Sequence, residues 1–209
     1  MRSPERSSRR DRRSAVLNAS LVLLFGAFAY ANFLGWRHTG RPVGLGAVCL
    51  EATVAALFIV RRPPRETSDR TLAWLSAPIG SFALLLARPV AQPHQGPLWI
   101  FELAQLWGFF LSVVCLLFLG RSFGIVAAAR DLKTRGVYSV VRHPVYAAYA
   151  IAYGGYVAEN PSARNVALLA IAGAAQLVRI HEEERLLGRD IAYRAYCERV
   201  RYRVIPFVY

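Results

Sequence analysis

Long apolar segments alternate with short polar ones along this chain. Two shorter apolar segments, 145–159 and 163–180, lie on either side of the turn sequence Glu159-Asn160-Pro161-Ser162. Four longer segments each approach the roughly 20 apolar residues that a helix needs to cross a bilayer: 15–35, 43–60, 72–89 and 98–119. The pattern predicts an all-α, polytopic transmembrane helical bundle of about six membrane helices, of which the last two form a C-terminal helical hairpin at 145–180.

The hairpin leaves two arrangements open. An apolar segment of about 15 residues either crosses the bilayer or forms a shallow, re-entrant structure. Both arrangements return the chain to the same side of the bundle, so the charged sequences before and after the hairpin should lie near each other.

Basic residues concentrate in alternate connections, namely the tail 1–14, the loop 61–71 and the segment 120–142, whereas 90–97 contains none. Because positively charged loops stay on the cytoplasmic side, we expect both termini and the region after residue 120 to be cytoplasmic. The net charge of +13 then reflects contact with anionic headgroups rather than with nucleic acid.

Composition narrows the class further. The chain is 55% hydrophobic and 19% charged, as expected for a membrane protein. Cys49 and Cys115 fall inside predicted membrane helices and Cys197 in the cytoplasmic tail, so no pair indicates a disulfide framework or a zinc site, which needs clustered ligands. Lys133 is the single lysine among 26 basic residues. This bias indicates a GC-rich genome, and hence a bacterial inner membrane.

Charged residues inside the apolar segments are of two kinds. Glu51 lies near the middle of the second segment, where a charge is costly and a functional role is the first hypothesis. A protonated or hydrogen-bonded structural glutamate explains it equally well. Arg88 and Glu102 lie near the outer ends of the third and fourth segments, and we predict that they pair.

Two charged clusters flank the hairpin: Arg142-His143-Pro144-Val145-Tyr146 before it and Arg179-Ile180-His181-Glu182-Glu183-Glu184 after it. Arg179 and Glu183 are one helical turn apart and can form an ion pair on one face. An arginine close to the membrane interface, as expected for Arg179, can hold a carboxylate in a bidentate fork, and a glutamate can hold an ammonium group. The alternative is that both clusters are interfacial anchors without chemistry.

Residues 119–208 resemble the isoprenylcysteine carboxyl methyltransferases, within the wider group that includes phospholipid methyltransferases. Six elements carry this resemblance in order: Gly136-Val137-Tyr138, Arg142-His143-Pro144-Val145-Tyr146, Asn160-Pro161, Arg179-x-x-x-Glu183-Glu184, Tyr193-x-x-Tyr196 and Ile205-Pro206. The sequence departs from the family pattern at Arg135 and at Ala147-Ala148.

The resemblance implies S-adenosyl-L-methionine as methyl donor and a lipophilic or lipid-modified acceptor among membrane lipids, with no metal and no nucleic acid. Arg179 would bind the substrate and act in catalysis, together with His143 if a hydroxyl acceptor must lose a proton. The residues implied to bind the cofactor are Arg130, Asp131, Leu132, Lys133, Tyr138, His143, Pro144, Val145, Tyr146 and Glu183.

Three regions are therefore expected: a basic cytoplasmic tail at 1–14, four scaffold helices at 15–119, and a catalytic methyltransferase region at 120–209. The acceptor group stays open between a carboxylate, as in isoprenylcysteine O-methylation, a phospholipid amine and a phenolic hydroxyl. Two other functions compete, an NADPH-dependent membrane reductase of the sterol type, which carries a similar Arg-His-Pro-x-Tyr element, and a scaffold without enzymatic activity.

Overall fold

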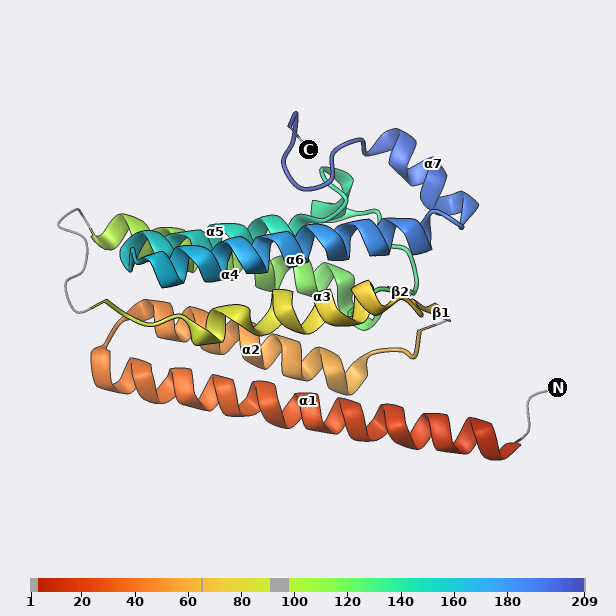
Figure 1. The fold of residues 1–209 in the computed structure, drawn as a ribbon, viewed down its shortest axis with the longest axis horizontal. Helices are drawn as coiled ribbons and strands as arrows, with labels where there is room; N and C mark the ends of the chain where they lie inside the picture. The colour runs from red at the N-terminus through yellow and green to blue at the C-terminus, as the bar shows by residue number, and fades with distance from the viewer. Residues whose placement is uncertain (1–3, 65, 91–97, 209) are drawn as a thin grey trace.

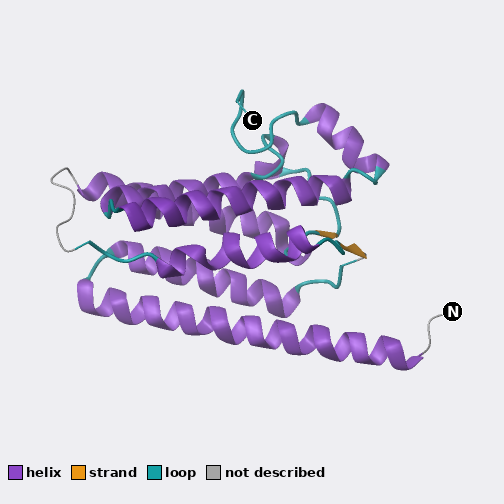
Figure 2. Ribbon diagram, viewed as in Figure 1, coloured by secondary structure: helices purple, strands orange, loops and turns teal. Residues whose placement is uncertain are grey.

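A computed structural model of the chain describes residues 4–64, 66–90 and 98–208, with side chains from residue 14 onward. The described chain is almost entirely helical (Figure 2), which confirms the predicted all-α class. Its helices are α1 (Pro4–Thr39), α2 (Pro42–Val60), α3 (Thr71–Phe82), α4 (Leu98–Leu119), α5 (Pro144–Glu159), α6 (Ala163–Leu187) and α7 (Ile191–Arg199). Short 3-10 turns occur at Ala83–Leu86, Gly120–Ser122 and Gly136–Ser139, and β1 (Glu66–Thr67) pairs antiparallel with β2 (Ala128–Ala129).

The predicted apolar segments form helices, and three of these helices differ clearly in length from the prediction. The first begins at Pro4 and ends at Thr39, whereas the sequence pattern predicts 15–35. Within the described residues, four helical stretches are long and apolar enough to cross a membrane: Ser14–Thr39, Pro42–Val60, Leu98–Ser122 and Ala163–Leu187. The third segment forms only the shorter stretch Thr71–Leu86, which contains Pro78 and ends in a 3-10 turn. The last helix passes the predicted end at residue 180, because its charged final turns continue the helix beyond the apolar segment.

The helices run side by side along the long axis of the molecule (Figure 1). Helix α1 packs on α2, α2 on α4, α4 on α5, and α3 on α6. The contact between α4 and α5 depends on Gly108, where a Cβ atom would lie 2.4 Å from the backbone nitrogen of Ala152. This close approach fixes α5, and with it the start of the hairpin, against the scaffold.

At the end of the bundle where α2 begins, ion pairs of Arg41 join α2 to α4 and α5, and the predicted pair between Arg88 and Glu102 does not form. Arg41 lies 2.6 Å from Glu159 and 3.6 Å from Glu102. The predicted Arg88–Glu102 pair is therefore wrong. The 3-10 turn after α3 directs residue 88 toward α6 instead, where its backbone N–H and C=O both bond to the side chain of Asn165.

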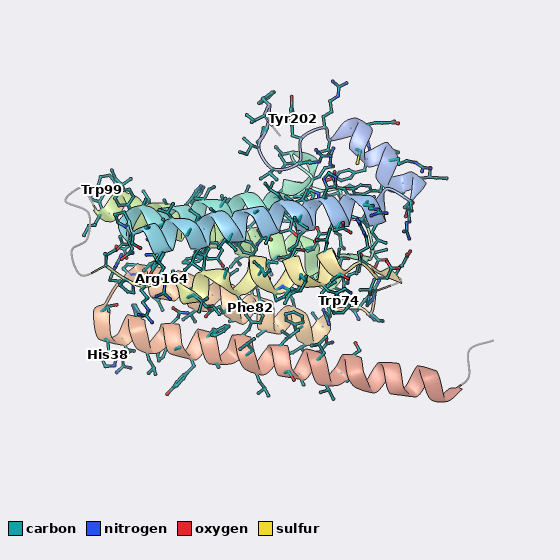
Figure 3. All side chains as sticks on the ribbon, in the orientation of Figure 1. His38, Trp74, Phe82, Trp99, Arg164 and Tyr202 are labelled. Carbon is teal, nitrogen blue, oxygen red and sulfur yellow. The ribbon has the colours of Figure 1, made fainter. Side chains whose placement is uncertain are left out.

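The two ends of the bundle carry different structures. His38, Trp99 and Arg164 lie at one end (Figure 3), whereas Tyr202 and the C-terminal segment lie toward the other. The start of α1, the β1–β2 pair and α7 share this second end (Figure 1). The start of α1 and the region after residue 120 thus lie at the same end of the bundle, and the assignment of this end to the cytoplasmic membrane face stays a prediction.

Candidate functional site

The site lies at the second end of the bundle, where α5 begins. Gly136 adopts a left-handed conformation, with φ of 62°, and opens the turn that leads to this helix. Pro144 occupies the first helical turn, where its missing N–H leaves no bond unmade. The backbone N–H groups of Arg142 and His143 donate to the carbonyls of Tyr202 and Arg203, at 3.0 and 2.7 Å. The C-terminal segment therefore lies directly against the His-Pro element.

Three consecutive glutamates of α6 have three different partners. Successive residues of a helix point about 100° apart, so each carboxylate leaves the helix in its own direction. Glu182 binds Arg70 at 2.6 Å, outside the site. Glu183 accepts a 2.7 Å hydrogen bond from the hydroxyl of Tyr146. Glu184 contacts three basic side chains, so Glu183 is the member of the cluster that faces the site.

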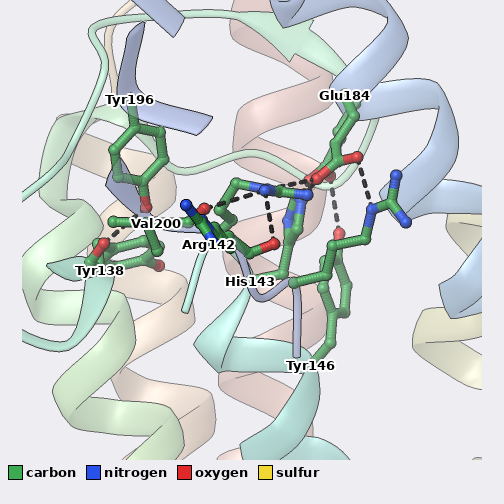
Figure 4. Close-up of polar contacts among 10 residues, drawn as sticks. Tyr138, Arg142, His143, Tyr146, Glu184, Tyr196 and Val200 are labelled. Atoms are coloured by element: carbon green, nitrogen blue, oxygen red, sulfur yellow. Dashed lines mark hydrogen bonds and ion pairs between the residues drawn. The ribbon is translucent and has the colours of Figure 1, made fainter. Parts of the chain in front are cut away.

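Glu184 holds the C-terminal segment in place (Figure 4). Its oxygens accept hydrogen bonds from Arg142 Nε at 2.8 Å and Arg203 Nε at 2.7 Å, and its Oε1 lies 3.3 Å from His143 Nε2. Arg142 also donates through Nη1 to the carbonyls of Val200 and Arg201, each at 2.9 Å. With these contacts Arg142, whose side chain is 9% exposed, connects the start of α5, α6 and the segment after α7.

We expect Glu184→Ala to loosen this segment without unfolding the bundle. Arg142 keeps its two carbonyl acceptors, so the loss should be about 1–2 kcal/mol of local stability, the usual scale for a charged hydrogen bond. Limited trypsin digestion of the purified protein measures the effect, because Arg199 and Arg201 offer cleavage sites there. Cleavage should become roughly tenfold faster. An unchanged rate would show that other contacts hold the segment.

Tyrosines form one wall of the site. The hydroxyl of Tyr196 donates to the backbone carbonyl of Tyr138 at 2.6 Å, a contact drawn in Figure 4. Burial raises the pKa of Tyr196 to about 12 and that of Tyr138 still further. Both phenols therefore remain protonated at neutral pH, so they serve as hydrogen-bond donors and ring surfaces rather than as bases.

These elements enclose a cavity of about 140 Å³ at the end of the bundle, hereafter the polar cavity. Its lining contains the residue predicted to bind the substrate, Arg179, and most of the residues predicted to bind the cofactor: Arg130, Asp131, Leu132, Lys133, Tyr138, His143, Val145, Tyr146 and Glu183. Pro144 is buried at the start of α5 and does not line it. The structure thus brings together residues that are up to 53 positions apart in the sequence.

Several residues that line this cavity were not among the predicted site residues. Tyr149 and Phe123 belong to none of the sequence motifs, whereas Arg142, Tyr193 and Tyr196 belong to the motifs but were given no binding role. The spacing of Tyr149, three residues after Tyr146 on one helix, was a usable signal. Phe123 carried no such signal, because it comes from the irregular chain after α4, whose path the sequence pattern does not define.

Arg179 is the most enclosed charge of the site, with 7% of its surface exposed. Its Nη1 donates to Gln176 and Ser81 at 3.0 and 3.3 Å, and its Nη2 donates to the carbonyl of Ile125 at 2.8 Å. Its guanidinium carbon lies 5.3 Å from the ring centre of Tyr146. Within the described residues, its Nε has no hydrogen-bond partner. The Arg179–Glu183 ion pair that the spacing permits does not occur among the described residues.

A second buried arginine Nε occurs on the loop after β2. Arg130 lines the polar cavity, and its Nε likewise lacks a partner among the residues that the structure describes. Burial lowers the pKa of Arg130 to about 10, with a further contribution from the positive charge of Arg61. The side chain is still cationic at neutral pH. Two cationic groups and the carboxylate of Glu183 are the complement of a ligand that carries both an acid and an ammonium group.

A second cavity, of about 230 Å³, lies between the helices on the other side of Arg179, and is hereafter called the apolar cavity. Its walls come from α1 to α5 and are rich in phenylalanine: Phe25, Phe28, Phe82 and Phe109. Three residues line both cavities, namely Phe123, Tyr149 and Arg179. Arg179 therefore borders a polar space on one side and an apolar, helix-lined space on the other.

Residues 100–191 match the model of the phospholipid methyltransferase family. No curated protein matches the chain. The matched stretch begins in α4, contains α5 and α6, and ends at the first residue of α7. The chain thus carries a phospholipid methyltransferase-like domain built on apolar helices, which indicates an integral-membrane methyltransferase.

The methyltransferase-like domain contains every site residue predicted from the sequence, from Arg130 to Glu183. Tyr193, Tyr196 and the segment that contacts Arg142 lie beyond it, as do α1 to α3, which supply much of the apolar cavity. The match supports the wider methyltransferase group and does not single out the isoprenylcysteine branch, so that finer resemblance stays a prediction.

Proposed function

We propose that the chain is an S-adenosylmethionine-dependent methyltransferase whose acceptor is a lipophilic acid that enters the site from the bilayer. One observation carries the proposal: Arg179, buried and with a free Nε–H, borders both the polar and the apolar cavity. A cation in this position can orient an acid group whose hydrocarbon part stays among the helices.

The polar cavity fits the cofactor by the chemistry of its donors and acceptors. Glu183 would bind the ammonium group of the cofactor, Arg130 its carboxylate, and the rings of Tyr138 and Tyr196 its apolar surfaces. S-adenosylmethionine, when bound, supplies a methyl group already activated by a sulfonium. The residues of the chain then need only to align the acceptor and to exclude water.

Arg179 and the aromatic walls would perform these two tasks. The free Nε–H of Arg179 orients an acceptor carboxylate, while its Nη groups remain bonded to Gln176, Ser81 and Ile125 and keep the guanidinium in place. A carboxylate oxygen is already deprotonated at neutral pH, so it needs no general base. The burial of Arg179 keeps water from competing at this position.

His143 has a supporting place in this scheme. Its Nδ1 lies 3.6 Å from Glu183 and its Nε2 lies 3.3 Å from Glu184. Each ring nitrogen thus faces a glutamate, an arrangement that positions Glu183 toward the cavity. A role as proton acceptor would be needed only for a hydroxyl acceptor, and stays a prediction.

The family match favours a second acceptor class, a phospholipid amine. The charge of Arg179 opposes this class, since a guanidinium repels an ammonium group at short range. The two acceptor classes give chemically different products, a methyl ester and a methylated amine, and can therefore be separated by experiment.

Isothermal titration calorimetry on the purified protein tests the cofactor assignment. We expect S-adenosylmethionine to bind and NADPH to give no heat of binding. Incubation of membranes with methyl-labelled cofactor, followed by mild alkaline hydrolysis, should release the label as volatile methanol, because methyl esters hydrolyse whereas methylated amines and methyl ethers do not. Preferential binding of NADPH would overturn the proposal in favour of a reductase. Label that stays non-volatile after alkali would reject the acid acceptor in favour of an amine or a phenolic hydroxyl.

A further inference from the structure

Glu51 and Asn32 place a polar group inside the apolar cavity. Asn32 Nδ2 donates to both carboxylate oxygens of Glu51, at 3.1 and 3.0 Å, and to the carbonyl of Phe28 at 3.1 Å. Both side chains line the apolar cavity. They belong to α1 and α2, outside the methyltransferase-like domain, and the proposed methyl transfer makes no use of them.

The carboxylate of Glu51 has unused capacity to accept hydrogen bonds. A carboxylate offers about four lone-pair sites. One of the two amide hydrogens of Asn32 goes to Phe28, so the other is shared between the two oxygens of Glu51. Among the described residues, no further donor to Glu51 occurs. A charged group in the middle of a membrane helix is costly unless it is paired, and the lone-pair sites left over lie on a cavity wall.

Arg179 provides the second polar boundary of the same cavity, and its Nε–H has no partner in the described chain. The Arg41–Glu159 ion pair holds the start of α2 level with the turn between α5 and α6. Glu51 is nine residues into α2, and Arg179 is sixteen residues into α6. At a rise of about 1.5 Å per residue, the two groups differ in depth by roughly 10 Å.

We propose that the apolar cavity selects an acceptor with two polar ends, an acid group at Arg179 and a hydrogen-bond-donating hydroxyl at Glu51. Because the two groups belong to different helices, their difference in depth is the minimum length of the hydrocarbon part that joins the two ends. A saturated chain of about eight bonds or more covers this length. The inference rests on the proposed function for the identity of the acid end, and extends it by naming a substrate class. Phenylalanines on the walls of the same cavity supply the apolar surface that the middle of such a molecule requires.

Equilibrium binding of two matched probes tests the inference without any methyl transfer. Radiolabelled 10-hydroxydecanoic acid and decanoic acid are bound to the purified protein in nanodiscs, with empty nanodiscs subtracted. Decanoic acid partitions more strongly into lipid, so a preference for the hydroxy acid must come from the protein. We expect the hydroxy acid to bind about tenfold more tightly.

Glu51→Met should remove this preference and leave the affinity for decanoic acid within about twofold, because methionine keeps the length of the side chain without an acceptor. Thr53→Val is the matched control on the same helix. Its hydroxyl donates to the carbonyl of Cys49, and its half-buried side chain lies outside the cavity. The control should keep the full preference.

Each outcome decides one question. Equal binding of the two acids by the unmodified protein would overturn the inference, even if the Glu51 variant failed to fold. A preference that survives Glu51→Met would overturn it as well. Methyl ester formation from decanoic acid without a hydroxyl preference would support the proposed function and reject the two-ended acceptor. A Glu51-dependent preference without methyl transfer to either acid would support a cavity with two polar ends and reject the proposed function.

Discussion

Glu183→Gln is expected to weaken the binding of S-adenosylmethionine by about 30- to 150-fold, or roughly 2–3 kcal/mol. Glutamine keeps the shape of the side chain and can still accept the hydrogen bond from Tyr146, which is 2.7 Å long in the structure. It loses the negative charge that would bind the ammonium group of the cofactor. Isothermal titration calorimetry on the purified variant measures the effect.

The neighbouring glutamate offers a matched control for this variant. Glu182→Gln removes the same charge one residue earlier on α6, but Glu182 pairs with Arg70 outside the polar cavity. The affinity of this variant for the cofactor should stay within about threefold of that of the unmodified protein, because the charge of Glu182 lies outside the cavity and solvent screens its effect on the cofactor. Equal losses in the two variants would mean that net charge, rather than a contact of Glu183, controls binding.

Arg179→Lys is expected to lower kcat/KM for the acceptor by about 100-fold or more, while the affinity for S-adenosylmethionine changes by less than about threefold. Lysine keeps the positive charge but cannot offer an Nε–H beside Nη groups that are held by Gln176, Ser81 and Ile125. The acceptor would then lose its orientation. Methyl-transfer kinetics at saturating cofactor measure the loss.

Two comparisons separate this effect from a loss of fold. Arg164→Lys makes the same exchange at the opposite end of α6 (Figure 3) and should leave kcat/KM unchanged. The midpoint of thermal unfolding of Arg179→Lys shows whether the α3–α6 contact survives. A cofactor affinity that falls as far as kcat/KM would place Arg179 at the donor rather than at the acceptor.

The sequence predicted the number and order of the helices because each apolar segment forms one helix. It predicted their ends less well. The third predicted segment extends to residue 89, but Pro78 and the following 3-10 turn shorten the helix. Arg88 could not be assigned its partner Asn165 from the sequence, because that contact depends on which helix packs against α3.

The sequence predicted which residues gather at the polar cavity, but it did not predict how these residues contact one another. Ordered motifs identified Tyr146, Arg179 and Glu183, and all three line the polar cavity. The sequence could not show that Arg179 turns away from Glu183, because spacing on one helix permits a pair without requiring it. Nor could it place Glu51 in a cavity shared with Arg179, since the two residues are 128 positions apart.

The three directions taken by Glu182, Glu183 and Glu184 limit what can change in α6. Deleting one residue upstream in this helix would rotate every later side chain by about 100°. Glu184 would then take the place of Glu183 beside Tyr146, and Glu183 would turn toward Arg70. A substitution at one of these positions loses only the contacts of that side chain, whereas a change of length would reassign the partners of all three glutamates at once. The length of α6 between its packing on α3 and its last turn is therefore more constrained than any single residue in it.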